Sequence, residues 1–192
     1  MDRISKAATR LWGSLGEDGH LHPSPRFADE LAECCDSSSL GVRVEQVSKW
    51  SYGEQLEHIY RGSHYVLDRL EEAMSGKNEQ EHMGFWGVGM MGAGFMPRYW
   101  FPTIPPLFPE SGTEEHIGPL RETLKERIAR IEWRLAEIKE ARGKSKHPRM
   151  KYLTPGQWVF FADIHHRHHL ALMRDILKAA GAGAALPEPL RI

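Results

Sequence analysis

The stretch that decides the fold runs from Leu153 to Leu177 and reads LTPGQWVFFADIHHRHHLALMRDIL. It opens with the signals of a helix start, because Thr154 can act as the N-cap, Pro155 fills the first helical position and Gln157 completes a capping box. At 100° per residue, one face of this helix collects apolar side chains and two histidines: Trp158, Phe161, Ala162, His165, His169, Leu172, Met173 and Ile176. The sequence therefore predicts a buried amphipathic helix whose histidines face the interior.

His165 and His169 are one helical turn apart, which suits two imidazoles that converge on one metal ion. Residues four apart on a helix have Cβ atoms roughly 5–6 Å apart. Two buried neutral imidazoles without partners would cost about 1–3 kcal/mol for each unsatisfied nitrogen, and a shared metal ion removes that cost. The alternative is that both are core residues satisfied by backbone groups or water. We expect His168 at the border of the apolar face, and His166 and Asp163 on the solvated side.

Length and charge exclude several classes of partner. With 192 residues, 41% hydrophobic and 27% charged, the chain can bury one sizeable core. A net charge of −1 favours neither nucleic acid nor an acidic membrane surface.

The cysteines, Cys34 and Cys35, are adjacent and cannot build a disulfide framework. The stretch 83–97 is too short and glycine-rich to span a bilayer, and the N-terminus lacks a signal-peptide core. We expect a cytoplasmic protein that binds no nucleic acid and no membrane.

One or two helices are predicted before residue 36. The first has apolar residues at helical spacing up to a stop at Gly16, and the second begins at Ser24 and Pro25. A loop between them carries His20 and His22. An exposed H-x-H pair of this kind is not expected to bind a metal ion.

A strong helix begins at Ser51, which forms a second capping box with Glu54. Its apolar face is traced by Leu56, Ile59, Ser63, Val66, Leu67, Leu70 and Met74. His58 lies to one side of this face. By spacing alone it is a boundary histidine comparable with His64. Glu54 and Glu57 are expected on the surface.

The central part of the chain is the least regular. The run GVGMMG at 87–92 matches G-x-G-x-x-G, but a dinucleotide site needs that pattern at a strand-to-helix turn, and no alternating strand precedes it. We expect instead a short helix near 84–95 and then a proline-rich loop, so that the 84–109 segment lines the mouth of a site. Its apolar wall includes Trp86, and its one charge, Arg98, is a candidate anchor for an anionic group of a substrate.

A further helix over 116–142 is predicted from apolar residues in steps of three and four: Ile117, Leu120, Leu124, Ile128, Ile131, Leu135 and Ile138. A seam of this length more often forms one wall of a bundle than a coiled-coil tail. The residues 143–152 read as a basic loop, and no stretch reads as a convincing strand. We therefore predict an all-α four-helix bundle in a single domain. The predicted parts are helices near 51–74, 84–95, 116–142 and 155–179, an N-terminal helical extension over 1–44, and a mobile tail over 180–192.

Two motifs resemble the DinB-like superfamily over roughly residues 45–178. The first is W-S-x-x-E-x-x-x-H, which ends at His58, and the second is L-T-P-x-Q-W-x-x-F-x-x-x-H-x-x-x-H, which ends at His169. The resemblance implies a bundle of four helices with a metal site formed by His58 from the second bundle helix and by His165 and His169 from the last. Members of the superfamily bind zinc, nickel or similar divalent ions. Some are hydrolases, and some are transferases or isomerases that use a low-molecular-weight thiol.

Three neutral imidazoles would leave a fourth position for water or substrate, as in catalytic zinc sites. The residues between His165 and His169 are His-Arg-His, so the H-E-x-x-H pattern of a metalloprotease is absent. We expect a zinc- or nickel-dependent hydrolase or thiol-dependent S-transferase, with a small molecule such as a low-molecular-weight thiol as partner. Two alternatives stay open. One is a non-catalytic metal-binding bundle, for example a homodimer, acting as sensor or scaffold; the other is a structural bundle with core histidines.

Overall fold

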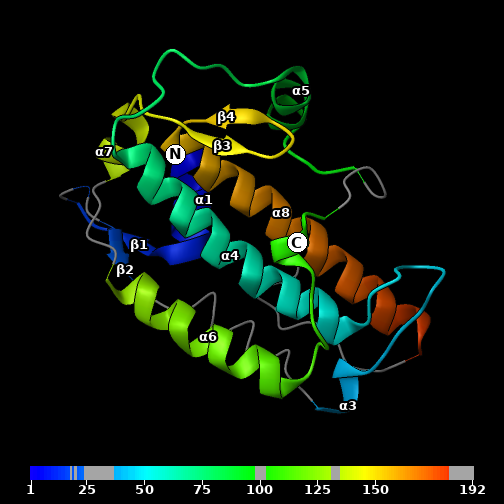
Figure 1. Cartoon of the computed structure of the whole chain (residues 1–192). Helices are drawn as coiled ribbons and strands as arrows, with labels where there is room; N and C mark the ends of the chain where they lie inside the picture. Colours follow the sequence, from blue (N-terminus) through cyan, green and yellow to red (C-terminus); the bar gives the residue numbers. More distant parts are fainter. Residues whose placement is uncertain (18, 20, 24–36, 98–102, 131–134, 182–192) are drawn as a thin grey trace.

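The long helices of the chain lie side by side as a bundle (Figure 1). The structure is a computed structural model and describes residues 1–17, 19, 21–23, 37–97, 103–130 and 135–181. The bundle helices are α1 (Arg3–Trp12), α4 (Tyr52–Met74), α6 (Glu114–Ala129) and α8 (Pro155–Ala179). Helix α8 packs against both α1 and α4, and α6 packs against α4. The predicted all-α fold is confirmed.

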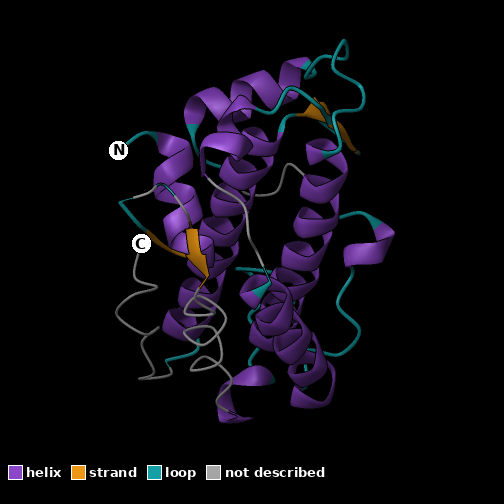
Figure 2. Ribbon diagram, turned by 90° about the vertical axis from the view of Figure 1, so that its left-hand side faces the viewer, coloured by secondary structure: helices purple, strands orange, loops and turns teal. Residues whose placement is uncertain are grey.

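Shorter elements connect and cover the bundle (Figure 2). The helical ones are α3 (Ser37–Leu40), α5 (Phe85–Ala93), the 3-10 turn η1 (Pro105–Leu107) and α7 (Leu135–Glu140). Two antiparallel hairpins pair β1 (Gly13–Leu15) with β2 (Leu21–Pro23) and β3 (Ser145–His147) with β4 (Lys151–Leu153). The prediction that β2 and the residues 143–152 lie in loops was wrong, because strands of three residues are too short to show an alternating pattern.

Both predicted capping boxes are present. The Ser51 side chain accepts the backbone N–H of Glu54, whose carboxylate accepts the N–H of Ser51. Thr154 and Gln157 make the same reciprocal pair at the start of α8. The predicted inner face of α8 is buried throughout, from Trp158 to Ile176. Local sequence signals therefore locate the two helices that carry the histidines.

Asp163 is buried, which contradicts its predicted position on the polar face of α8. It is 2% exposed and forms ion pairs with Arg10 of α1 at 2.6 Å and with Arg167 at 3.1 Å. Helix α1 covers this side of α8. A single apolar stripe describes a helix with one neighbour, whereas α8 packs on α1 as well as on α4, and its contact with α1 includes this paired charge.

The seam predicted over 116–142 does not form one helix. Helix α6 ends at Ala129, and α7 begins at Leu135, where it packs against α8 and α1. The seam residues from Ile117 to Ile138 that the structure describes are buried or partly buried. Heptad spacing predicts which residues are buried. It does not predict that the residues of α6 and those of α7 pack against different helices.

The remaining sequence predictions concern the N-terminal region, the central glycine-rich run and the C-terminal tail. Helix α1 ends at Trp12, before the predicted stop at Gly16, because Gly13 begins β1. The run 87–92 lies inside α5, so it is not a strand-to-helix turn. The helix predicted from Ser24 and most of the predicted tail lie outside the described residues, as does His20. In the described part of the chain, no helix combines the length and apolar character needed to cross a bilayer.

Candidate metal centre

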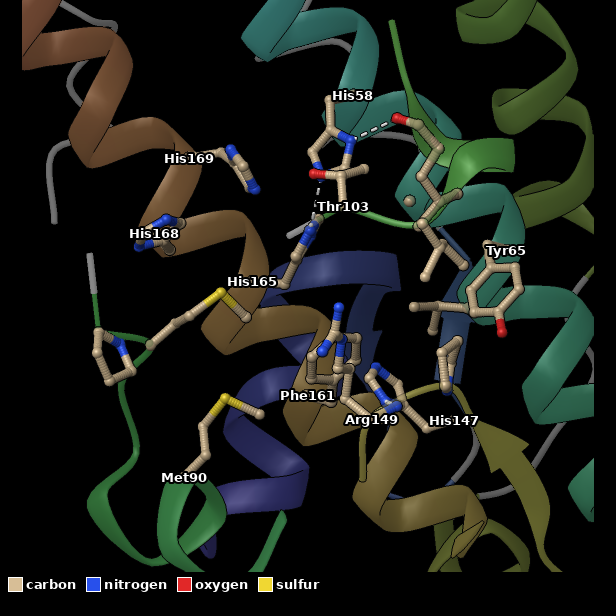
Figure 3. Close-up of a pocket in the computed structure, with 17 residues that line it drawn as sticks. His58, Tyr65, Met90, Thr103, His147, Arg149, Phe161, His165, His168 and His169 are labelled. Atoms are coloured by element: carbon tan, nitrogen blue, oxygen red, sulfur yellow. Dashed lines mark hydrogen bonds between the residues drawn. The ribbon is translucent and has the colours of Figure 1, made fainter. Parts of the chain in front are cut away.

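Three histidines from α4 and α8 converge on one point (Figure 3). Nε2 of His58 lies 3.0 Å from Nε2 of His165. The ring of His169 lies with its centroid 4.5 Å from each of the other two ring centroids. One nitrogen of each ring lies within 4.8 Å of the others, and all three residues are 3–6% exposed. The packing of α4 on α8 thus joins the i, i+4 pair to a third imidazole.

Two of the rings are oriented by hydrogen bonds from their outer nitrogens. His58 donates from Nδ1 to the carbonyl oxygen of Leu107 at 2.7 Å, and His169 donates from Nδ1 to Oε1 of Gln55 at 2.6 Å. The amide of Gln55 is itself held, because its nitrogen donates to Oγ of Ser48. Protons on Nδ1 leave the Nε2 lone pairs of both rings directed at the shared point.

The third ring, that of His165, fits closely between the helices. A Cβ atom at Gly62 would lie 2.9 Å from its Cε1 atom, so the glycine makes room for the imidazole. Its Nδ1 is buried and has no hydrogen-bond partner among the described residues. The short distance between Nε2 of His58 and Nε2 of His165 is favourable in only two cases. Either one nitrogen donates a hydrogen bond to the other, or both direct their lone pairs at a cation.

Burial keeps these imidazoles uncharged. It lowers the pKa of His58 to about 4, and it holds the pKa values of His165 and His169 well below their usual range. Neutral imidazole is the form that binds metal ions. Two nitrogens at about 2.0–2.1 Å from one zinc ion lie roughly 2.9–3.4 Å apart, and the 3.0 Å separation of His58 and His165 falls in that range. The donor set therefore fits a divalent metal ion.

The family model of the DinB superfamily matches residues 6–173. The chain belongs to the DinB superfamily. The match takes in parts or all of α1, α4, α6 and α8 and every histidine of the cluster. The match begins at residue 6, about 40 residues before the start of the region in which the two motifs resemble the superfamily. No curated protein and no solved structure matches the chain significantly.

Glu57 is fully buried in this DinB protein, which contradicts the prediction of a surface position. Its carboxylate accepts backbone N–H groups of Glu110, Ser111 and Gly112 at 2.8–3.1 Å and pairs with Arg61 at 2.8 Å. Burial alone would raise the pKa of Glu57, but these bonds hold it below its usual value. The carboxylate thereby attaches the segment 110–112 to α4. This segment comes shortly after Leu107, whose carbonyl accepts the hydrogen bond from His58.

The other histidines of the two helices lie outside the three-nitrogen group. His64 bonds through Nε2 to the carbonyl of Leu120, and His168 lines a cavity beside the cluster. His166 is 4% exposed and bonds through Nε2 to Oγ of Ser63 at 3.0 Å. Its predicted surface position was wrong, because α4 packs over that part of α8.

A cavity of about 110 Å³ opens beside the cluster. The 84–109 segment contributes to its wall as expected, through Met90, Met96, Pro97, Thr103, Ile104 and Leu107. Trp86 is 54% exposed and is not among the lining residues, and Arg98 lies outside the described residues.

Sequence reasoning missed four contributors to the site: Gln55, Glu57, the Leu107 carbonyl and Arg149, which also lines the cavity. A signal was available for Gln55, which lies three residues before His58 and thus near it on α4. No comparable signal exists for a backbone carbonyl or for a residue in a hairpin turn.

Proposed function

We propose that this protein is a divalent-metal-dependent enzyme of the DinB superfamily. His58, His165 and His169 would hold a zinc or nickel ion, and the reaction would be hydrolysis of a small molecule or transfer of a group involving a low-molecular-weight thiol. The observation that carries this proposal is the convergence of three buried, neutral imidazoles beside a cavity. Closed structural sites use four protein ligands, whereas three ligands leave a position for water or substrate.

The residues of this chain have separate roles in such a site. When bound, the ion would act as a Lewis acid that lowers the pKa of a water or thiol. Gln55 and the Leu107 carbonyl hold two imidazoles in the tautomer that presents Nε2. The apolar side chains of Met90, Met96 and Ile104 limit the water around the substrate.

The direct test is the metal content of the purified full-length chain, measured by elemental analysis after removal of any affinity tag. We expect about one zinc or nickel ion per chain, and we expect His165→Ala to lose it. His82→Ala is the matched control, because His82 is exposed and is not one of the three clustered histidines; it should keep full occupancy. His166→Ala should also keep the ion. A folded His165→Ala variant with full occupancy would contradict the site assignment.

A second measurement tests the reaction. The chain loaded with zinc or nickel is assayed on a panel of esters and on a panel of thiol conjugates, with the metal-free chain as control. We expect metal-dependent turnover on one panel. Stoichiometric metal without turnover on either panel would contradict the enzyme and favour a sensor or scaffold.

A further inference from the structure

Arg149 lies at the cavity, in the turn between β3 and β4. It lines the cavity together with the three clustered histidines. Figure 3 shows its side chain beside Phe161 and His147, with His165 between it and His58. The residue is exposed, and its guanidinium has no hydrogen bond or ion pair among the described residues. A cation is therefore available at the mouth of the cavity.

The backbone that carries Arg149 is fixed in place. Nδ1 of His147 accepts the backbone N–H groups of both Arg149 and Met150 at 3.1 Å. The carbonyl of Met150 accepts the N–H of Gly84 at 2.8 Å, which ties the turn to the start of α5. The His147 ring packs on Trp158 and Phe161 of α8. The turn is thus held from within the hairpin, from α5 and from α8.

The electrostatic surroundings leave the charge of Arg149 without compensation. The described lining contains no aspartate or glutamate, and Arg149 is its one permanently charged side chain. Arginines that the fold uses for packing are paired with carboxylates, such as Arg10 with Asp163 and Arg61 with Glu57. Arg149 differs from them because it has a cavity beside it instead of a carboxylate.

The rest of the lining is suited to an apolar group. Val66, Met90, Met96, Ile104, Leu107 and Phe161 supply aliphatic, thioether and aromatic surface. Such walls favour an apolar ligand body through burial. An arginine at the edge of an apolar pocket binds a carboxylate through two parallel hydrogen bonds, which gives both energy and orientation.

We propose that the cavity binds a compact amphipathic carboxylate, with its apolar body between Met90, Met96 and Phe161 and its carboxylate on Arg149. This inference rests on the proposed function in that it names the substrate class for the same site. Arg149 would anchor the anion in the way that the sequence predicts for Arg98, which lies outside the described residues. The ligand would then present its far end, or a group beside its apolar body, to the three histidines.

The test compares two probes of equal size, hexanoate and hexanamide, by calorimetric titration into the metal-free, full-length protein. Removal of the metal excludes a direct bond between carboxylate and ion. We expect hexanoate to bind at least about tenfold more tightly than hexanamide, as an ionic hydrogen-bonded pair provides. The change Arg149→Met should abolish that preference and leave hexanamide binding unchanged. The matched control is Arg142→Met, an exposed arginine outside the cavity lining, which should keep the preference.

The outcomes separate this inference from the proposed function. Equal binding of the two probes, failure of both to bind at millimolar concentration, or an Arg149→Met variant that keeps the preference would each overturn the carboxylate assignment. None of these results bears on the metal content. Conversely, absence of metal from the purified chain would contradict the proposed enzyme and leave the probe result intact. The Arg149→Met effect on hexanoate should persist in metal-loaded protein.

Discussion

At the scale of single residues, the candidate metal centre depends on groups that hold the imidazoles as much as on the imidazoles. Gln55 is 1% exposed, accepts the Nδ1–H of His169 and is fixed by its own bond to Ser48. A group that accepts the outer N–H of a ligating histidine sets the tautomer and the orientation of the ring. Loss of such a group typically lowers metal affinity by 10–100-fold.

We expect Gln55→Ala to weaken zinc binding by about tenfold or more, because the Nδ1–H of His169 loses its acceptor and the ring loses its orientation. A competition titration with a zinc chelator measures the change. The matched control is Gln55→Glu, which keeps an oxygen at the same distance and should retain affinity. Equal affinities of the alanine variant and the unchanged chain would contradict this role for Gln55.

At the scale of elements, the site is assembled where α4 and α8 meet the segment that follows η1. The carboxylate of Glu57 accepts three consecutive backbone N–H groups of that segment. Gly112, at φ +66°, and Gly53 permit the close approach, because a Cβ on either would overlap the backbone of the other. The approach keeps the Leu107 carbonyl within reach of His58.

We expect Glu57→Gln to lower the free energy of unfolding by about 2 kcal/mol, because an amide has one oxygen for three N–H donors and leaves Arg61 without its buried partner. Urea unfolding measures the loss, and the chelator titration should show weaker zinc binding in the same variant. Glu110→Gln alters the exposed partner of Arg61 and should cost less than about 1 kcal/mol. Similar values for the two variants would contradict a special role for Glu57.

At the scale of the whole molecule, packing keeps several histidines uncharged. Burial lowers the pKa values of His58, His147 and His166 to about 4 each. The unfolded chain binds protons at these positions near pH 6.5, whereas the folded chain does not. Stability therefore rises with pH between about 4 and 6.5, because the unfolded state holds more protons there.

We expect the metal-free protein to lose about 1 kcal/mol of unfolding free energy per such histidine between pH 7 and 5.5. Urea unfolding at the two pH values measures the difference. Replacing the partly buried His147 by Gln should reduce the pH dependence by one such increment. A pH-independent stability over this range would contradict neutral burial of these rings.

The sequence alone determined the elements whose signals are local. Capping boxes and helical periodicity located α4 and α8, and the i, i+4 spacing singled out His165 and His169. Spacing could not choose between His58 and His64, and that choice came from the resemblance to the DinB superfamily. Metal occupancy stays a prediction.

Only the tertiary structure decided which polar groups are buried and what they bind. Periodicity assigned Asp163, His166 and Glu57 to the surface, but each is buried against a group from another segment. The physical reason is that the periodicity of apolar residues describes only which face of one helix is mostly buried. The partner that satisfies a buried charge, or the turn that brings Arg149 to the cavity, belongs to a distant part of the chain and exists only once the helices have packed.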